Sequence, residues 1–201
     1  MSGTTGAEEP GAQPDTGPER KGQRTRRRIL EAARRCFGQL GYERATIRGI
    51  AAAAGVDKSS VIQYFESKQR LFREAVHFEI PIDELTTTDP AQTVENYLRT
   101  MLERWASESD TPMSVLLRAS MTSDDAAALL RRHVAVNAND RIMSHLDSPD
   151  ARLRAGLFSA IMVGIASGRY LLRIPDLADA DLEEVLRVSV PVVQALIKPE
   201  D

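Results

Sequence analysis

Four side chains between residues 58 and 63 are of types that can bind the edges of DNA bases. Lysine can donate to a phosphate or a guanine edge, glutamine can pair with adenine, serine can donate or accept, and isoleucine can contact a thymine methyl group. At helical spacing these side chains share one face: Lys58, Ser59, Ile62 and Gln63. The spacing predicts an exposed face that contacts bases, and packing against the preceding helix is the alternative for Ile62.

The neighbouring residues predict the element that must position this face. Thr46 can cap a helix over 47–54, because its hydroxyl can accept from an N–H group of the first turn. Gly55 can adopt a positive φ in a tight turn, and Asp57 can cap a second helix that ends near Tyr64. Two short helices joined in this way form a helix-turn-helix, whose second helix enters the major groove of DNA.

Candidate phosphate-binding groups flank this unit. Thr46 stands at a helix N-terminus, where N–H groups and a hydroxyl can hold a phosphate, and Arg48 follows in the first turn. Residues 24–28 contain four arginines, among them Arg24 and Arg28, which could reach a phosphate or an adjacent minor groove. A solvated helix start is the alternative for this arm.

The charge of the chain is divided unevenly along its length. Residues 20–73 carry fourteen Lys or Arg against four acids, a formal charge of +10, whereas residues 74–201 carry twelve bases against twenty-one acids, a formal charge of −9. A basic unit joined to an acidic one indicates that the first part binds a polyanion and that the second does not.

Helical periodicity without any alternating strand pattern predicts an all-α chain of about nine helices. The expected ranges are 24–40, 47–54, 58–64, 67–78, 90–105, 112–121, 124–146, 151–172 and 181–196. Residues 1–23 hold five Gly, three Pro and one large apolar residue, Met1, and therefore predict a disordered tail. We therefore expect two domains: a three-helix helix-turn-helix domain over 24–72 and a second helical domain over 73–201.

Residues 24–72 resemble the N-terminal domain of TetR-family (tetracycline-repressor-like) transcriptional regulators. The matching residues are Arg28-Ile29-Leu30-Glu31-Ala32-Ala33, Phe37, Gly41-Tyr42, Thr46, Ile50-Ala51, Ala54-Gly55-Val56, Tyr64-Phe65, Ser67-Lys68 and Leu71-Phe72. The stretch 152–196 resembles one actinobacterial-type C-terminal class of the family through Arg152, Arg154-Ala155, Gly164, Arg169-Tyr170, Leu172-Arg173, Pro191 and Gln194. Ser59 and Ile62 depart from the common pattern, which has glycine and tyrosine there.

The resemblance implies a homodimeric repressor that binds double-stranded DNA at a palindromic operator and is often released by a small molecule. By position, Thr46 and Lys68 match residues that contact the phosphate backbone. The recognition helix then contains Lys58, Ser59, Ser60, Ile62, Gln63 and Tyr64. A DNA-binding regulator without an effector is the second hypothesis, and an all-α enzyme is the third.

The last two long helices carry stripes that predict a dimer interface. One stripe has small residues that let another helix approach: Ala160, Gly164, Ser167 and Gly168. The other is formed by Val185, Ser189, Val192 and Leu196. Two such helices from each subunit would form a four-helix bundle, and packing within one subunit is the alternative.

Large, soft apolar residues in the second domain predict an adaptable effector pocket, with plain core packing as the alternative. The candidates are Met101, Trp105, Leu117, Met121, Phe158 and Met162, together with Met113 and Met143. Arg118 or His133 could pair with an anionic ligand.

Other function classes lack the motifs that they need. There is no phosphate loop, dinucleotide fingerprint, nucleophile elbow or zinc-protease motif, so we expect no enzyme and no cofactor. His77, His133 and His145 show no metal-ligand spacing, and Cys36, the single cysteine, is expected to be an inert core thiol. The longest uncharged stretch near the C-terminus, 155–168, is shorter than a membrane span. We therefore expect a cytoplasmic protein without a membrane partner.

Overall fold

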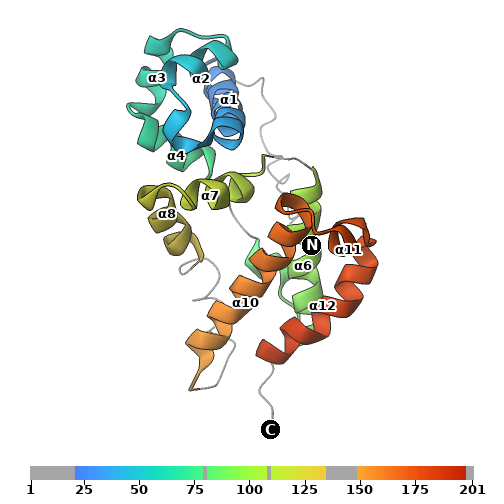
Figure 1. Cartoon of the computed structure of the whole chain (residues 1–201). Coiled ribbons are helices and arrows are strands. Elements are labelled where there is room, and N and C mark those ends of the chain that lie inside the picture. Colours follow the sequence, from blue (N-terminus) through green and yellow to red (C-terminus); the bar gives the residue numbers. More distant parts are fainter. Residues whose placement is uncertain (1–20, 79–80, 108–109, 135–148, 198–201) are drawn as a thin grey trace, which may run out of the picture.

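The computed structural model describes residues 21–78, 81–107, 110–134 and 149–197, and every regular element in this part of the chain is a helix (Figure 1). The all-α prediction is confirmed. The elements are α1 (Lys21–Arg44), α2 (Ile47–Ala54), α3 (Lys58–Phe65), α4 (Lys68–Ala75), α5 (Ile82–Leu85), α6 (Pro90–Ser107), α7 (Pro112–Ser120), α8 (Asp124–Val134), α10 (Ala151–Ala166), the π-helix η2 (Ser167–Leu171), α11 (Pro175–Asp179) and α12 (Leu182–Ile197).

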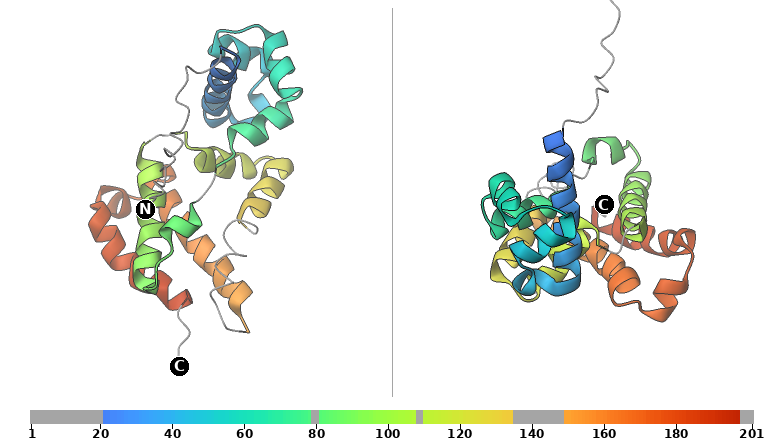
Figure 2. Two further views of the ribbon diagram at one scale, coloured as in Figure 1. Left: turned by 180° about the vertical axis from the view of Figure 1, so that it is seen from behind. Right: turned by 90° about the horizontal axis from the view of Figure 1, so that it is seen from above.

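The described helices form three groups along the length of the molecule (Figures 1 and 2). We call α1–α4 the head, α7 and α8 the joint, and the elements α5, α6, α10, η2, α11 and α12 the body. The head lies on the joint, and α6, α10 and α12 pack together on the other side. None of the helices in the described ranges is both long enough and apolar enough to span a membrane.

Local capping explains where the helices of the head begin and end. The Thr46 hydroxyl accepts from the N–H of Gly49 at 3.0 Å, and Ser67 accepts from Arg70 at the start of α4. Gly55 has a φ of 63° after α2, and Gly41 has a φ of 77° near the end of α1. The cap at Thr46 and the turn at Gly55 are confirmed, because both depend on groups within four residues.

Some predicted helix boundaries were wrong. Residues 21–23, predicted to belong to a disordered tail, form the first turn of α1, and α4 ends at Ala75 instead of Phe78. An additional short helix, α11, begins at Pro175, where the missing N–H of proline costs nothing. Asp57 stands at the N-cap of α3, yet its exposed side chain accepts no cap hydrogen bond. The predicted segments 1–20 and 135–146, with Met143 and His145, lie outside the described residues.

Two hydrophobic cores hold the protein together. The first fills the head and continues into the joint, because Val115, Leu116, Ala119 and Ala126 are buried in the same cluster as the side chains of α1–α4. The second packs α6, α10 and α12 around Leu98, with the buried side chains Val94, Leu102, Trp105, Phe158, Met162, Val185 and Val193. The core of the head therefore does not stop at residue 72.

Candidate functional site

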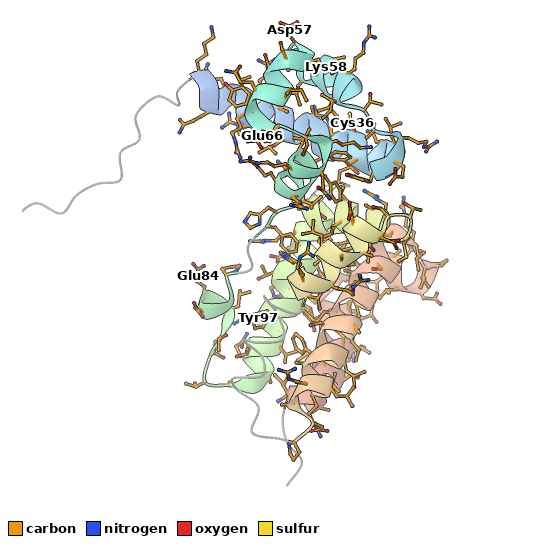
Figure 3. All side chains as sticks on the ribbon, turned by 90° about the vertical axis from the view of Figure 1, so that its left-hand side faces the viewer. Cys36, Asp57, Lys58, Glu66, Glu84 and Tyr97 are labelled. Atoms are coloured by element: carbon orange, nitrogen blue, oxygen red, sulfur yellow. The ribbon has the colours of Figure 1, made fainter. Side chains whose placement is uncertain are left out.

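The predicted base-contacting face of α3 is exposed at the end of the molecule. Figure 3 shows Lys58 at the tip of the head, on the side away from the body. Lys58, Ser59 and Gln63 are exposed, and Ile62 is 40% exposed, so its side chain is not buried against α2. Val61 and Phe65 are fully buried beneath α3 and hold it to the core of the head. This arrangement leaves one polar face of a short helix open to a groove.

Ser60 and Tyr64 lie at the edge of this face and are half-buried. The Tyr64 hydroxyl lies beside Gly22 in the first turn of α1, where an added Cβ would be 3.3 Å from its oxygen. The start of α1, with the exposed Arg24, is therefore next to the recognition helix. This proximity agrees with the predicted arginine arm.

Thr46 and Arg48 lie at the N-terminus of α2, and both are exposed. The Thr46 oxygen already accepts from Gly49, but its hydroxyl proton can still be donated to a phosphate. The partial positive charge of the helix N-terminus favours an anion at the same place.

Two of the predicted DNA-contacting residues have partners inside the head. The Arg28 guanidinium donates to the carbonyl of Ala54 at 2.6 Å, so it caps the C-terminus of α2. The Lys68 ammonium donates to the carbonyl of Glu43 at 3.1 Å and lies 4.5 Å from the centre of the Tyr42 ring. Periodicity could not predict these partners, because they lie 25 or 26 residues away in the sequence.

A cavity of about 280 Å³ lies between the body and the joint. It brings together four of the predicted pocket residues, Met101, Trp105, Phe158 and Met162, and also Met113. The other two are elsewhere: Leu117 is buried in the core outside the cavity lining, and Met121 is 76% exposed beyond the end of α7. Met121 was placed wrongly because α7 ends at Ser120, so the helical stripe does not continue to it.

The cavity wall includes two residues that sequence reasoning did not connect. Phe78, in the link after α4, and His133, near the end of α8, lie with their ring centres 4.0 Å apart. Burial lowers the pKa of the His133 imidazole, and the nearby His77 lowers it further. A lowered pKa favours the neutral form of the His133 ring.

The predicted dimer stripes are only partly on the surface. Ala160, Gly164 and Val192 are exposed, but Val185 is buried in the core of the body and Gly168 is buried against Leu177. The hydroxyls of Ser167 and Ser189 donate to carbonyls of their own helices, those of Val163 and Val185, and Leu196 is half-buried. Val185 and Gly168 therefore pack within one subunit, which was the alternative for these stripes, because both helices also pack against α6 or its neighbours.

Exposed apolar side chains complete the outer face of α10 and α12. They are Leu153 and Leu157 on α10, and Val188 beside Val192 on α12. Sequence reasoning missed these residues, although Leu153, Leu157, Ala160 and Gly164 follow a spacing of four, three and four. That spacing marks one stripe of a helix. The outer face of α10 and α12 thus exposes a group of apolar side chains to solvent.

The remaining candidate groups show no reactive arrangement in the described residues. Cys36 is half-buried, and burial raises the pKa of its thiol, which keeps the sulfur protonated at neutral pH. Across the described ranges, no cluster of three or more His, Cys, Asp or Glu side chains is placed to bind a metal ion.

Comparison with known families gives two matches that together span most of the chain. Residues 29–75 match "Bacterial regulatory proteins, tetR family", and residues 91–197 match "Tetracyclin repressor-like, C-terminal domain". The second match alone covers more than half of the 201 residues.

Curated relatives match chiefly in the head. An HTH-type transcriptional repressor of Mycobacterium tuberculosis is 43% identical over 47 residues, which are 23% of this chain and 25% of that protein. The repressor AcnR of Corynebacterium glutamicum is 44% identical over 48 residues, 24% of this chain and 26% of AcnR. The regulatory protein RaaS of M. tuberculosis is 31% identical over 146 residues, 72% of this chain and 64% of RaaS. The chain thus spans about a quarter of the length of the first relatives that it matches.

Solved structures share the whole architecture. A TetR-family regulator from Streptomyces coelicolor superposes with a TM-score of 0.57 at 28% identity, covering 90% of this chain and 98% of that one. NalD of Pseudomonas aeruginosa, the secondary repressor of a multidrug efflux pump, has a TM-score of 0.66 at 18% identity, covering 86% and 97%. The likeness to NalD extends to the fold alone.

Proposed function

Because the chain belongs to the TetR family of bacterial regulatory proteins, we propose that it is a sequence-specific DNA-binding transcriptional repressor. One observation carries this proposal: the polar face of α3 at the end of a basic head, on which Lys58, Ser59 and Gln63 are exposed. Figure 3 shows Lys58 on the side away from the body. A surface of this kind, held by a helix-turn-helix, fits the major groove. The repressor names of the relatives support the direction of regulation.

We further propose that the protein binds DNA as a homodimer. The apolar outer face of α10 and α12 supports this, because a twofold axis through that face would join two bodies in a four-helix bundle. Two recognition helices ~34–36 Å apart would then contact two half-sites of a palindrome. The rest of the DNA-contacting set would be Thr46 and Arg48 at the start of α2, Arg24 in the arm, and Lys68, because an ammonium has three donors and the Glu43 carbonyl accepts only one of them.

Replacing Gln63 and Lys68 separately tests the DNA-binding assignment. Gln63→Ala should relax the preference at one base-pair position of each half-site by about 10- to 100-fold, because a glutamine that pairs with adenine discriminates by ~1–3 kcal/mol. Lys68→Ala should weaken binding to every DNA sequence about equally. It should also reduce, by about one, the steepness with which the logarithm of the binding constant falls with the logarithm of the salt concentration. The sequence preference and the DNA affinity of both variants are measured by selection from a random DNA pool at two salt concentrations.

Gln39→Ala is the matched control, because Gln39 is an exposed glutamine on α1, outside the recognition helix. It should leave the selected sequence unchanged. An equal loss on every sequence for Gln63→Ala would contradict a base contact at this position. A wild-type protein that selects no sequence would contradict the proposed function itself.

The cavity supports release by a small molecule. Its described lining is mainly apolar and aromatic, and it includes Phe78 in the link that follows α4. A ligand in the cavity would therefore contact the segment that joins the head to the body. If the ligand binds more tightly to one arrangement of the two heads, it shifts the population and changes the operator affinity by the coupling free energy.

A Thr100→Trp variant tests the cavity as a ligand site. Thr100 lines the cavity from α6, so the indole should fill much of the space and reduce binding of an uncharged apolar probe by about tenfold or more. The probe is N-phenyl-1-naphthylamine, whose fluorescence rises in an apolar site. Glu103→Trp, on the exposed side of α6, is the control and should bind the probe normally. If the Thr100→Trp variant binds the probe as tightly as the Glu103→Trp control, the result favours the hypothesis of a regulator without an effector in this cavity.

A further inference from the structure

A second hollow lies on the body beside the joint, and three arginines line it. Its volume is about 410 Å³, and we call it the arginine pocket. Arg118 comes from α7, Arg169 from η2 and Arg173 from the turn after η2, with the rings of Trp105 and Tyr170 in the same lining. None of these arginines belongs to the DNA-binding face.

The charge of this pocket is opposite to that of its surroundings. Residues 74–201 carry a formal −9, yet the described lining has three arginines and one acid, Asp179; a second acid, Asp110, pairs with Arg118 from outside the lining, so positive charge still exceeds negative charge here. Like charges in one hollow repel each other, and an anion between them relieves the repulsion. A concentration of positive charge inside an acidic region therefore points to an anionic ligand.

Two of the arginines keep donors available for a ligand. Arg169 donates to the carbonyl of Leu177, and its guanidinium lies 5.6 Å from the centre of the Tyr170 ring, so its orientation is set. Arg173 is exposed, and within the described part of the chain its side chain forms no hydrogen bond or ion pair. Guanidinium groups bind carboxylates and phosphates through paired N–H donors.

The backbone that presents these two residues has an unusual conformation. The α-helix α10 continues into the π-helix η2, and Leu172 donates to the carbonyl of Ser167 at 2.8 Å across the wider turn. Arg173 then has a φ of 52°, which is left-handed and unfavourable for a residue with a Cβ. π-Helical turns occur frequently at functional sites, and this one supplies Arg169, Tyr170 and Leu171 to the pocket, with Arg173 shortly after it.

We propose that the arginine pocket binds a small organic anion that carries a carboxylate or phosphate on a flat ring. The oxyanion binds to the guanidinium groups of Arg169 and Arg173 and to that of Arg118, where it competes with the Asp110 carboxylate, and the ring lies against Tyr170. This site is separate from the apolar cavity, although Trp105 contributes to the walls of both. Its occupation does not depend on the proposed DNA-binding function.

The pocket also has a direct structural connection to the head. Arg118 donates to the Asp110 carboxylate at 2.8 Å, and Asp110 packs against Gly38 of α1. An added Cβ on Gly38 would lie 2.7 Å from the Asp110 carboxyl carbon and 3.2 Å from an Arg118 nitrogen. A bound anion competes with Asp110 for Arg118, and it therefore changes the contact between α1 and the joint.

The experiment uses Trp105, the only tryptophan of the chain, as its reporter. The purified protein is titrated without DNA, at constant ionic strength, with benzoate, phenyl phosphate and the uncharged benzamide, and tryptophan fluorescence is recorded. At least one of the two anions should bind about tenfold or more tightly than benzamide. A difference between the two anions identifies the favoured oxyanion. Binding no tighter than that of benzamide for both would overturn the proposal.

Variants then place the binding in this pocket. Arg173→Gln should lower the affinity for the anion about tenfold. Arg152→Gln, which replaces an exposed arginine on α10 outside the pocket, should leave this affinity unchanged. Asp110→Asn should raise the affinity several-fold, because the competing carboxylate charge is removed. An equal effect of Arg173→Gln and Arg152→Gln would overturn the site, and so would weaker binding in a folded Asp110→Asn protein. Because no DNA is present, these results are independent of whether the protein is a repressor.

Discussion

In a Leu157→Arg variant, the dimer should dissociate and the affinity for a palindromic operator should fall by about 100-fold or more. Leu157 is 44% exposed on the outer face of α10, between Leu153 and Ala160. In a twofold interface each residue occurs twice, so one substitution places two arginines into an apolar surface. The mass in solution is measured by sedimentation, and DNA binding is measured on full and half operators selected by the wild-type protein.

Met121→Arg is the matched control for this substitution. Met121 is even more exposed than Leu157, but it lies beyond the end of α7 and belongs to neither α10 nor α12. The Met121→Arg variant should remain dimeric and bind the operator with the affinity of the wild-type protein. Val192→Arg, on α12, should repeat the effect of Leu157→Arg. If both stripe variants remain dimeric with full operator affinity, the outer face of α10 and α12 is not the interface.

In a Phe37→Ala variant, the head should lose ~3–5 kcal/mol of stability, a large part of the 5–15 kcal/mol that is typical of a whole domain. Phe37 is 1% exposed, and its ring packs edge-on against Phe72 at 5.0 Å and stacks on Tyr42 at 5.8 Å. Truncation leaves a cavity between α1 and α4. DNA binding should be lost near the temperature at which the head unfolds.

Amide hydrogen exchange measures which helices the Phe37→Ala substitution destabilises. Because Leu116 and Ala119 of α7 are buried in the core of the head, protection should fall in α7 as well as in α1–α4, while α6 and α12 keep theirs. Phe37→Leu, which keeps most of the apolar volume, should cost roughly half as much or less. Unchanged protection in α7 beside an unfolded head would mean that the head is stable by itself.

Features that depend on a few neighbouring residues could be predicted from the sequence. The helix-turn-helix is one of them, because the Thr46 cap, the left-handed Gly55 and the buried spacing of Val61 and Phe65 all act within one or two turns. The exposed set on α3 followed from the same spacing. The all-α class followed from helical periodicity along the whole chain.

Features that depend on distant partners could not be predicted in this way. Arg28 was a candidate DNA contact, and only the structure shows that its guanidinium also caps α2 through the carbonyl of Ala54. Val185 was a candidate dimer residue, but it is buried in the body. Helical periodicity states which residues share a face, and it does not state which neighbour that face meets. Only the packing of α1 on α2, of α12 on α6 and of the head on α7 decided these roles. The arginine pocket likewise exists only because α7 and the turn after η2, about fifty residues apart, come together in the fold.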